Sequence, residues 1–372
     1  MAVKTWIATT PSTWGTAASW SPSGVPGSAD DVIFNNTYNG DCVFAFSTIK
    51  SLVMTGYSGS FSGTANMTIS GSDTGTSTGN SFVFSSTMTQ SWTGAVTFTS
   101  GIGGYITLNG KSLNNNITFN NATGVWRVQD VLNQTTGSLT VTAGNVTFTD
   151  DVNVASTLTL TAGTLTALNC ANITIGNQFL SSNSNVRTLN MGCGTWTFTT
   201  SNWTTATSTN MTLNAEQSRI LYAQPGNANI QFQGGNLTYY TFEIARGNST
   251  GTISIGGNNT FVNLIDNTST AAHTIQFTTT GTNSFYKFIV QGSSGNLVTV
   301  TRGVLANYVL QKLGRDVVSN TNFTTWTAGT AMTGSAANTW YVGPNSTVGT
   351  TVGFIASNPP SVQSLLGAGG VG

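Results

Sequence analysis

The chain has 372 residues, enough for a large core or two domains, yet only 6% of them are charged, against roughly 25% in an ordinary soluble domain. Eleven Lys and Arg balance eleven Asp and Glu and lie scattered, so no basic stripe is available to neutralise phosphates, and nucleic-acid binding is disfavoured. No stretch reaches the roughly 18 apolar residues of a transmembrane helix, so we expect no membrane insertion.

Residues 1–45 form a Trp- and Pro-rich segment that we interpret as a cap with the first strands. Its tryptophans are widely spaced, and a pair of aspartates opens the first clear strand pattern at 30–34. A stacked fold needs its first coil covered, because an open coil end exposes apolar side chains and unpaired backbone. No apolar run follows the single early Lys, so we expect no signal peptide. The cap candidates are Trp6, Trp14, Trp20, Asp30 and Asp31.

Residues 46–302 alternate apolar and polar side chains with the period of two that predicts strands. In GSLTVTAGNVTFTDD, at 137–151, the apolar set Leu139, Val141 and Phe148 alternates with threonines. Threonine keeps β-propensity high on an outer face while removing charge from it. This segment therefore predicts strands with a narrow apolar core and an uncharged exterior.

Internal repeats indicate stacked rungs. SLTVTAG recurs as TLTLTAG after 19 residues, and AVTF, NVTF and TWTF place three phenylalanines at intervals of fifty. Units of about 20 to 30 residues therefore predict single rungs, with fifty residues covering two. The expected core rung positions are Phe98, Leu139, Val141, Phe148, Leu189 and Phe198.

Strands flanked loosely by Asn and Gly favour an all-β parallel β-helix, because these residues tolerate left-handed backbone at corners. Each rung is too small to bury its own apolar face, so stacking on neighbours creates the core. The main alternative is a set of antiparallel β-sandwich domains, which would need tight turns every 8–12 residues.

The C-terminal part is expected to close the solenoid. Residues 303–357 predict the last rungs and a closing coil, and 358–372 predict a flexible or docking tail. Lys312 and Arg315 beside Asp316 form the most charged short segment. They are candidates for a salt bridge between subunits, with a plain exposed turn as the alternative interpretation.

The three cysteines are few and widely spaced, without a C-x-x-C motif. We expect Cys42, Cys170 and Cys193 to be buried thiols acting as small core residues. His273 is the single histidine, which leaves little for zinc binding or histidine-based acid–base catalysis. We therefore predict no metal site and no cofactor.

The acidic residues offer two candidate sites, each with a simpler interpretation. Asp130 and Asp150, with Arg127 nearby, would form a glycosidase-like carboxyl pair if they lay on stacked rungs, and solvated corner residues otherwise. Asp41 with the Asp pair at 30–31 would supply oxygen ligands for Ca²⁺. The favoured alternative is that one Asp of this pair caps a turn by accepting backbone N–H bonds.

Exposed aromatic side chains would be able to stack on sugars, but their exposure is not evident from sequence. Trp196 falls at an expected rung position, which favours the core. The loop GIGGY, at 101–105, lacks the Lys-Ser/Thr of a phosphate loop, so we interpret it as structural. The remaining aromatic candidates are Trp92, Trp126, Trp203, Tyr239, Tyr240 and Tyr286.

Both ends resemble β-helix proteins of tailed phages and environmental bacteria. TWIATTPSTWGTAASWSPSGVPGSADDVIF resembles their opening, in which spaced tryptophans and P-x-G-V-P precede a paired-Asp strand. NTWYVGPNSTVGTTVGFIA, at 338–356, resembles their closing coil, with Phe354 where that group has Trp and a further tail after Ile355. The resemblance implies a right-handed parallel β-helix, often trimeric, found in virion fibres, tail parts or surface adhesins.

These observations together predict a non-enzymatic structural protein of a phage-like virion: a fibre, tail-associated or capsid-decorating component. It would act as a homo-oligomer, most simply a trimer, contact other virion proteins and assemble in the host cytoplasm. One alternative is a spike that binds a cell-surface glycan or degrades polysaccharide, which requires a groove with two carboxylates and exposed aromatics. The other is an extracellular bacterial adhesin or filament subunit, which requires export.

Overall fold

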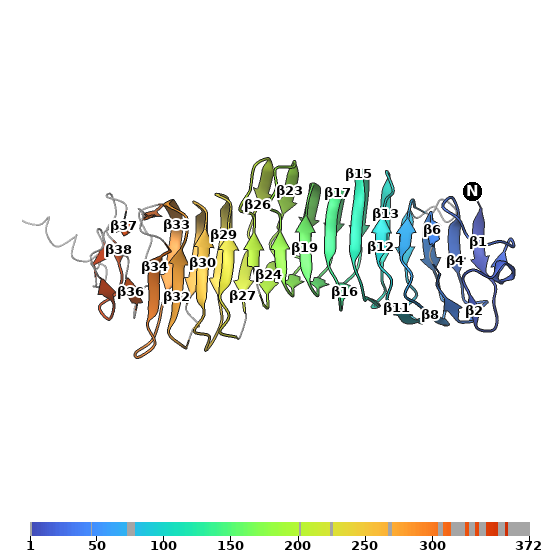
Figure 1. Cartoon of the computed structure of the whole chain (residues 1–372), viewed down its shortest axis with the longest axis horizontal. Helices are drawn as coiled ribbons and strands as arrows, with labels where there is room; N and C mark the ends of the chain where they lie inside the picture. The colour runs from blue at the N-terminus through green and yellow to red at the C-terminus, as the bar shows by residue number, and fades with distance from the viewer. Residues whose placement is uncertain are drawn as a thin grey trace, which may run out of the picture. The chain divides into compact units, whose positions relative to one another are not determined.

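The computed structural model describes residues 2–45, 47–72, 79–200, 202–223, 226–266, 270–303, 308–313, 324–326, 332–334, 340–348 and 354–355. This part of the chain consists of strands, turns and one short 3-10 helix, η1 (Ala17–Ser19). It contains no helix long and apolar enough to cross a membrane. Two compact units are present: Met1–Phe198 with Thr207–Ser218, and Thr199–Ala206 with Arg219–Gly372. Figure 1 shows the strands of each unit lying side by side.

The first unit is a parallel β-solenoid with three sides. Its first side is a ladder of strands that each pair in parallel with the next coil. These strands are β6 (Ser47–Ile49), β9 (Met67–Ile69), β12 (Val96–Phe98), the first half of β15 (Ile117–Val128), the first half of β17 (Leu139–Phe148), β19 (Thr157–Leu160) and β22 (Gln178–Leu180).

The second side continues from the first after a corner in each coil, and β15 and β17 bend through this corner without leaving their ladders. Its other strands are β1 (Val3–Trp6), β4 (Asp31–Phe34), β7 (Ser51–Met54), β10 (Asn80–Val83), β13 (Gly103–Thr107), β20 (Gly163–Ala167), β23 (Arg187–Asn190) and β26 (Met211–Asn214).

The third side is made of two shorter parallel runs. One contains β2 (Ser12–Thr13), β5 (Cys42–Val43), β8 (Ser60–Gly63) and β11 (Thr89–Trp92). The other contains, within this unit, β14 (Ser112–Leu113), β16 (Leu132–Gln134), β18 (Val152–Val154), β21 (Ile173–Ile175) and β24 (Thr195–Phe198).

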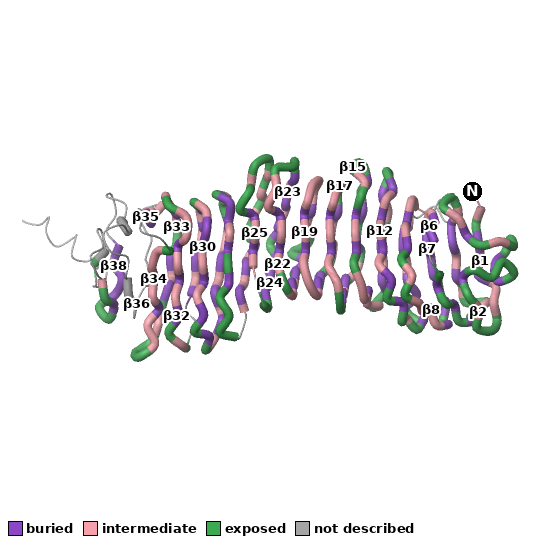
Figure 2. Tube along the Cα trace, in the orientation of Figure 1, coloured by how far each residue is buried: buried purple, intermediate pink, exposed green. Residues whose placement is uncertain are grey.

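The core is a set of stacked columns, because parallel in-register pairing places every inward residue above its counterpart. Phe98 lies against Phe119 with ring centroids 5.0 Å apart and nearly parallel planes. Val141 and Leu160 continue the same column, and all four side chains are buried. Figure 2 shows buried positions alternating with more exposed ones along the strands. The alternation read from sequence therefore has a direct physical cause in this stacking.

The Trp-rich segment covers the first coil of this unit. Trp6, Trp14 and Trp20 are buried and pack edge to face, with Trp20 centroids 5.0 Å from Trp6 and 4.8 Å from Trp14. Phe34 from the next coil stacks on Trp6 at 5.5 Å. Strand β3 (Trp20–Ser21) pairs antiparallel with β1, so the first strand of the solenoid is not left as an open edge.

Single coils of the first unit span 19 to 30 residues, so the expectation of rungs of 20 to 30 residues is close. The 19-residue repeat is real, because Leu139 pairs in register with Leu158. The fifty-residue repeat is wrong, because Phe98, Phe148 and Phe198 lie on three different sides, in β12, β17 and β24. Coils of unequal length shift the register, so Leu189 likewise stacks on Leu165 and not above Leu139. All six expected core positions are nevertheless buried.

The second unit repeats the parallel architecture with coils of 22 to 29 residues. One run contains β25 (Asn202–Thr204), β28 (Ile230–Gln233), β30 (Thr252–Gly256), β32 (His273–Phe277), β34 (Val298–Arg302), β36 (Thr324–Trp326) and β39 (Thr347–Val348). The other contains β27 (Arg219–Tyr222), β29 (Thr238–Ile244), β31 (Thr260–Asp266), β33 (Gly281–Val290), β35 (Tyr308–Lys312) and β37 (Met332–Gly334). A short pair, β38 (Trp340–Tyr341) and β40 (Phe354–Ile355), is also parallel.

The fold is therefore a parallel β-helix, as predicted, and the antiparallel sandwich alternative is wrong. The division near residue 199 falls inside the segment 46–302, which the sequence presented as one run of rungs. The expected tail at 358–372 lies outside the described residues.

Candidate functional site

One outer surface of the first unit is a column of stacked threonines. Six consecutive rungs of the first side place a threonine at the same outward register position. Each is half-buried, because its neighbours above and below cover its flanks at a rung spacing of about 4.8 Å. We call this surface the threonine column; its members are Thr48, Thr68, Thr97, Thr118, Thr140 and Thr159.

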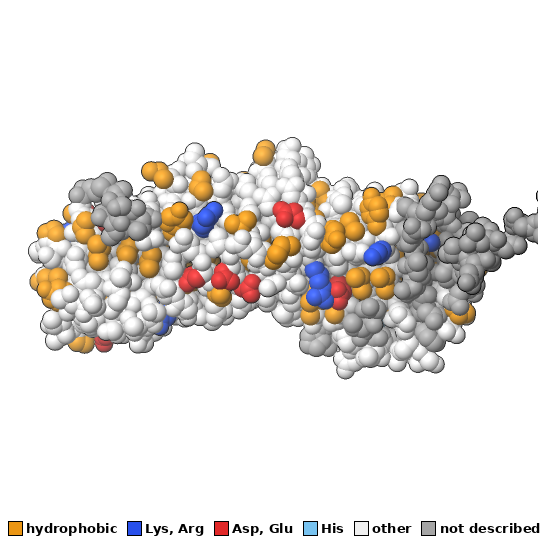
Figure 3. Space-filling model, turned by 180° about the vertical axis from the view of Figure 1, so that it is seen from behind, with side chains coloured by type: hydrophobic (Ala, Val, Ile, Leu, Met, Phe, Trp, Pro, Cys, Tyr) orange, Lys and Arg blue, Asp and Glu red, His pale blue; other side chains and the backbone are white. Residues whose placement is uncertain are grey.

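Amide ladders occupy the other sides of this unit. On the second side, Asn214 Nδ2 donates to Asn190 Oδ1 at 2.7 Å, and Asn190 Nδ2 donates to Thr166 Oγ1 at 2.9 Å. On the third side, Asn153 Nδ2 donates to Asn133 Oδ1 at 3.0 Å. The outer polar groups therefore bond along the solenoid axis, from rung to rung. Figure 3 shows Lys, Arg, Asp and Glu as isolated patches among uncharged atoms on the face in view.

The aspartates of the cap segment bind protein donors. Asp30 accepts the backbone N–H groups of Ala2 and Gly27, both at 3.0 Å, so the predicted turn cap is confirmed. Asp31 is buried, 3.0 Å from Lys50 Nζ, and accepts the Ser51 hydroxyl at 2.7 Å. Asp41 accepts the Ser60 N–H at 2.8 Å. Within the described residues, no group of three or more His, Cys, Asp or Glu is placed to hold a metal ion.

The Asp130 and Asp150 pair behaves as corner residues in the structure. Asp130 accepts the backbone N–H groups of Leu108 and Asn109, and Asp150 accepts the N–H of Asp151. Arg127 points outward from β15 beside Tyr105 of β13, so the three residues do not share one set of contacts. These carboxylates hold turns between rungs, which is the simpler of the two interpretations.

The tryptophans offered as sugar platforms are core residues. Trp92, Trp126 and Trp196 in the first unit and Trp203 in the second are each at most 1% exposed. Tyr239 is also buried, and its hydroxyl donates to the Gly234 carbonyl at 2.8 Å. Of the named aromatics, Tyr240 is half-buried, and Tyr286 is the exposed one, at 49%.

Two of the three cysteines do not behave as predicted. Cys170 and Cys193 form a disulfide with Cα atoms 4.4 Å apart, and both residues are exposed. They occupy equivalent positions in consecutive coils, because Ile173 pairs with Trp196 at the same separation of 23 residues. The 23 residues between the two cysteines in the sequence give no sign that they are neighbours in space. Cys42 is a buried thiol, as predicted, and burial raises its pKa well above the usual range.

Arg187 is a buried cation that the sequence analysis missed. Its guanidinium donates to the carbonyl oxygens of Ser181, Asn185, Thr207 and Thr209 at 2.6 to 3.0 Å, and its Nε donates to the Ser181 hydroxyl at 2.8 Å. Burial lowers its pKa. The signal was present, because the alternation of RTLNM places Arg187 on the same inward face as Leu189 and Met191.

A second buried charge cluster, also missed, lies in the second unit. Asp266 Oδ2 is 2.6 Å from His273 Nε2, and neither side chain is more than 2% exposed. Arg246 donates to the Gly226, Ala228 and Gly251 carbonyls at 2.6 to 3.2 Å. Burial opposes charge on His273, but the hydrogen bond to Asp266 and its negative charge outweigh it, so the His273 pKa is raised.

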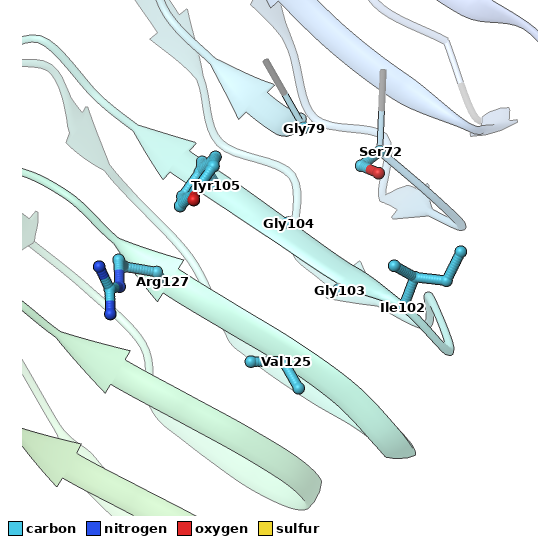
Figure 4. A pocket seen from close by; sticks show the side chains of 8 residues that line it. All are labelled: Ser72, Gly79, Ile102, Gly103, Gly104, Tyr105, Val125 and Arg127. Carbon is cyan, nitrogen blue, oxygen red and sulfur yellow. The ribbon is translucent and has the colours of Figure 1, made fainter. Parts of the chain in front are cut away.

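A hollow of about 370 Å³ opens on the second side of the first unit (Figure 4). Its floor is formed by Gly79, Gly103 and Gly104, and its walls by the side chains of Ser72, Ile102, Tyr105, Val125 and Arg127. Gly103, at φ +91°, must be glycine, because a Cβ there would lie 1.8 Å from the Val125 carbonyl oxygen. The loop interpreted as structural, GIGGY, thus forms one edge of this hollow.

The charged C-terminal candidates are only partly described. Lys312 Nζ lies 5.2 Å from the centroid of the Trp340 ring, and burial lowers the Lys312 pKa. Arg315 and Asp316 lie outside the described residues.

Comparisons with known proteins yield no match: no family model matches the chain, and neither the curated proteins nor the solved structures contain one that does. The site must therefore be interpreted from its own geometry.

Proposed function

We propose that the protein is a non-enzymatic structural component of a phage-like virion that assembles as a homo-oligomer, most simply a trimer, through an uncharged side of its solenoid. The threonine column carries this proposal. Six methyl and hydroxyl groups repeat at rung spacing on one side of the first unit. A repeating neutral surface packs against another of the same repeat without setting like charges opposite one another.

The Trp-rich cap segment favours association of copies through the sides of the solenoid and disfavours association through its N-terminal end. Trp6, Trp14 and Trp20 cover the first coil, and β3 pairs with the outer edge of β1. The N-terminal end of the first unit is therefore closed to strand addition. Contacts between copies then fall to the sides of the solenoid, where the threonine column presents its uncharged surface. The Trp-rich opening, which resembles phage β-helix proteins, supports the virion setting.

The test is the mass of the native assembly, measured by light scattering on the full chain and combined with electron microscopy. We expect a stable trimer or an ordered array for the wild type. The double variant Thr118→Lys/Thr140→Lys places two cations in the centre of the column. We expect it to run as a monomer with an unchanged circular dichroism spectrum, because half-buried outward positions accept a lysine stem.

Thr174→Lys is the matched control. Thr174 is also a half-buried, outward, mid-strand threonine of the first unit, but it lies in β21 on the third side. Its assembly mass is expected to equal that of the wild type. A monomeric wild type, or a Thr118→Lys/Thr140→Lys variant that still assembles, would contradict the proposal.

A further inference from the structure

The hollow of Figure 4 exposes apolar side chains that the solenoid elsewhere hides. Ile102 is 83% exposed and Val125 is 54% exposed, although most large apolar residues of this unit point inward. Tyr105 of β13 pairs in register with Arg127 of β15, and Val125 lies two residues before Arg127 on the same strand (Figure 4). Exposed apolar residues grouped at a concave surface mark binding sites more often than single scattered ones do.

Three polar side chains around the hollow have no hydrogen-bond partner among the described residues. The Ser72 hydroxyl, the Tyr105 hydroxyl and the Arg127 guanidinium make no hydrogen bond or ion pair with any described residue. This distinguishes Arg127 from Arg187 and Arg246, whose donors are bound to backbone carbonyls. Gly104 has no room for a side chain, because a Cβ there would lie 2.0 Å from Ser81 Oγ and 2.7 Å from the Gly79 carbonyl oxygen.

We propose that this hollow binds an acidic sugar unit of a polysaccharide, with the sugar carboxylate on Arg127 and the apolar face of the ring against Tyr105. A guanidinium and a carboxylate form two parallel charge-assisted hydrogen bonds. A pyranose ring presents C–H groups on one face, which pack on an aromatic ring, and hydroxyls at its edge, one of which can reach the Ser72 hydroxyl. The volume lies in the range of small-ligand pockets, roughly 300–1,000 Å³.

An acidic peptide fits the hollow less well. Added strands bind through unpaired backbone, but the Tyr105 N–H donates to the Gly79 carbonyl at 3.0 Å, and the Val125 N–H donates to the Ile102 carbonyl at 3.3 Å. Strands β10, β13 and β15 also pair with one another across the site. A peptide would have side-chain contacts alone, whereas a sugar acid matches the pairing of the Tyr105 ring with the Arg127 cation.

The test is titration of the full chain with trigalacturonate, followed by calorimetry and by saturation-transfer NMR. We expect binding of the acid trimer and at least about tenfold weaker binding of its neutral methyl ester, because the ester cannot pair with Arg127. Arg127→Gln should weaken the acid trimer by about tenfold and should leave the ester unchanged. Tyr105→Ala should weaken both ligands by about fivefold.

The chain supplies a matched control pair. Tyr286 and Lys287 are an exposed aromatic residue and an exposed cation on β33 of the second unit. Tyr286→Ala and Lys287→Gln should leave trigalacturonate binding unchanged. The proposal is overturned if the acid trimer binds more weakly than about 10 mM, if acid and ester bind equally, or if the control variants lose as much. Equal binding of a triglutamate peptide would overturn the sugar assignment.

This binding does not depend on the structural role proposed above. Arg127 lies on the second side and the threonine column on the first, so Thr118→Lys/Thr140→Lys should alter assembly mass and leave trigalacturonate binding intact. The two proposals can therefore fail separately.

Discussion

Each unit contains a buried arginine that binds carbonyl oxygens of neighbouring loops, but the charges around the two arginines differ. Arg187 in the first unit and Arg246 in the second both donate to carbonyl oxygens of neighbouring loops. Arg187 makes five such bonds, four to carbonyls and one to a hydroxyl. Among the described residues, Arg246 has three such partners, and its Nε has none.

The difference lies in the neighbouring charges. The negative charge of Asp266 acts on Arg246, and Asp266 is bound in turn to His273. In the first unit the bonds of Arg187 go to neutral oxygens, so its loop is held at any ordinary pH. In the second unit, a titratable histidine shares the carboxylate, so the same kind of loop anchor becomes sensitive to pH.

The largest expected effect is that of Arg187→Met. The variant keeps a side chain of similar length but removes the donor from one buried carbonyl and from three partly buried ones. We expect a loss of about 3 to 5 kcal/mol in the free energy of unfolding, measured by urea denaturation. Increased proteolysis between residues 199 and 211 would show that the loop has opened.

Arg246→Met sharpens the comparison as the matched variant. It removes fewer hydrogen bonds, and Asp266 keeps His273 as a partner, so the loss should be smaller than for Arg187→Met. An equal or larger loss would mean that Arg246 stabilises the fold mainly through its interaction with the Asp266 carboxylate and not through its hydrogen bonds to carbonyls.

Removing the disulfide is expected to have the next largest effect on the free energy of unfolding. Replacing Cys170 and Cys193 by serine opens a loop of 23 residues and should lower the free energy of unfolding by about 3 kcal/mol. Adding reductant to the wild type should reproduce that loss. The serine double variant should no longer respond to reductant; a response would point to Cys42, which is buried in the native chain.

The smallest effect is the pH dependence of the second unit. The folded His273 pKa is raised by Asp266, so its contribution to stability is complete below the unfolded value of about 6.5 and is lost as pH rises through the folded value. The urea midpoint of the full chain, followed by circular dichroism, should therefore fall as the pH rises above about 6.5. His273→Asn should abolish this dependence of the urea midpoint on pH. If the dependence stays unchanged, a group other than His273 causes it.

The fold was predictable because its determinants are local. Alternation, loose Asn and Gly corners and the Trp-rich opening each act within a few residues, and together they gave the parallel solenoid and its covered first coil. Register was not predictable, because it depends on the length of every coil. Phe98, Phe148 and Phe198 look equivalent in sequence, but coils of unequal length carry them to three sides.

The site was less predictable for the same reason. Arg187 stood in an inward position of RTLNM, so attention to alternation would have found it. The proximity of Cys170 to Cys193 requires knowing that a coil there has 23 residues. The hollow joins GIGGY to Arg127 through register alone, so no spacing in the sequence indicates it.

The exposed disulfide between Cys170 and Cys193 makes the redox state of the chain depend on the compartment in which it has been. Thiols in a reducing cytosol stay apart, whereas an oxidising exterior joins them. Because the two residues face solvent on adjacent coils, oxidation needs no unfolding and leaves the rungs in place. The reduced and the oxidised chain differ by two hydrogen atoms, so the intact mass of the protein would report the redox state of the environment from which it was taken.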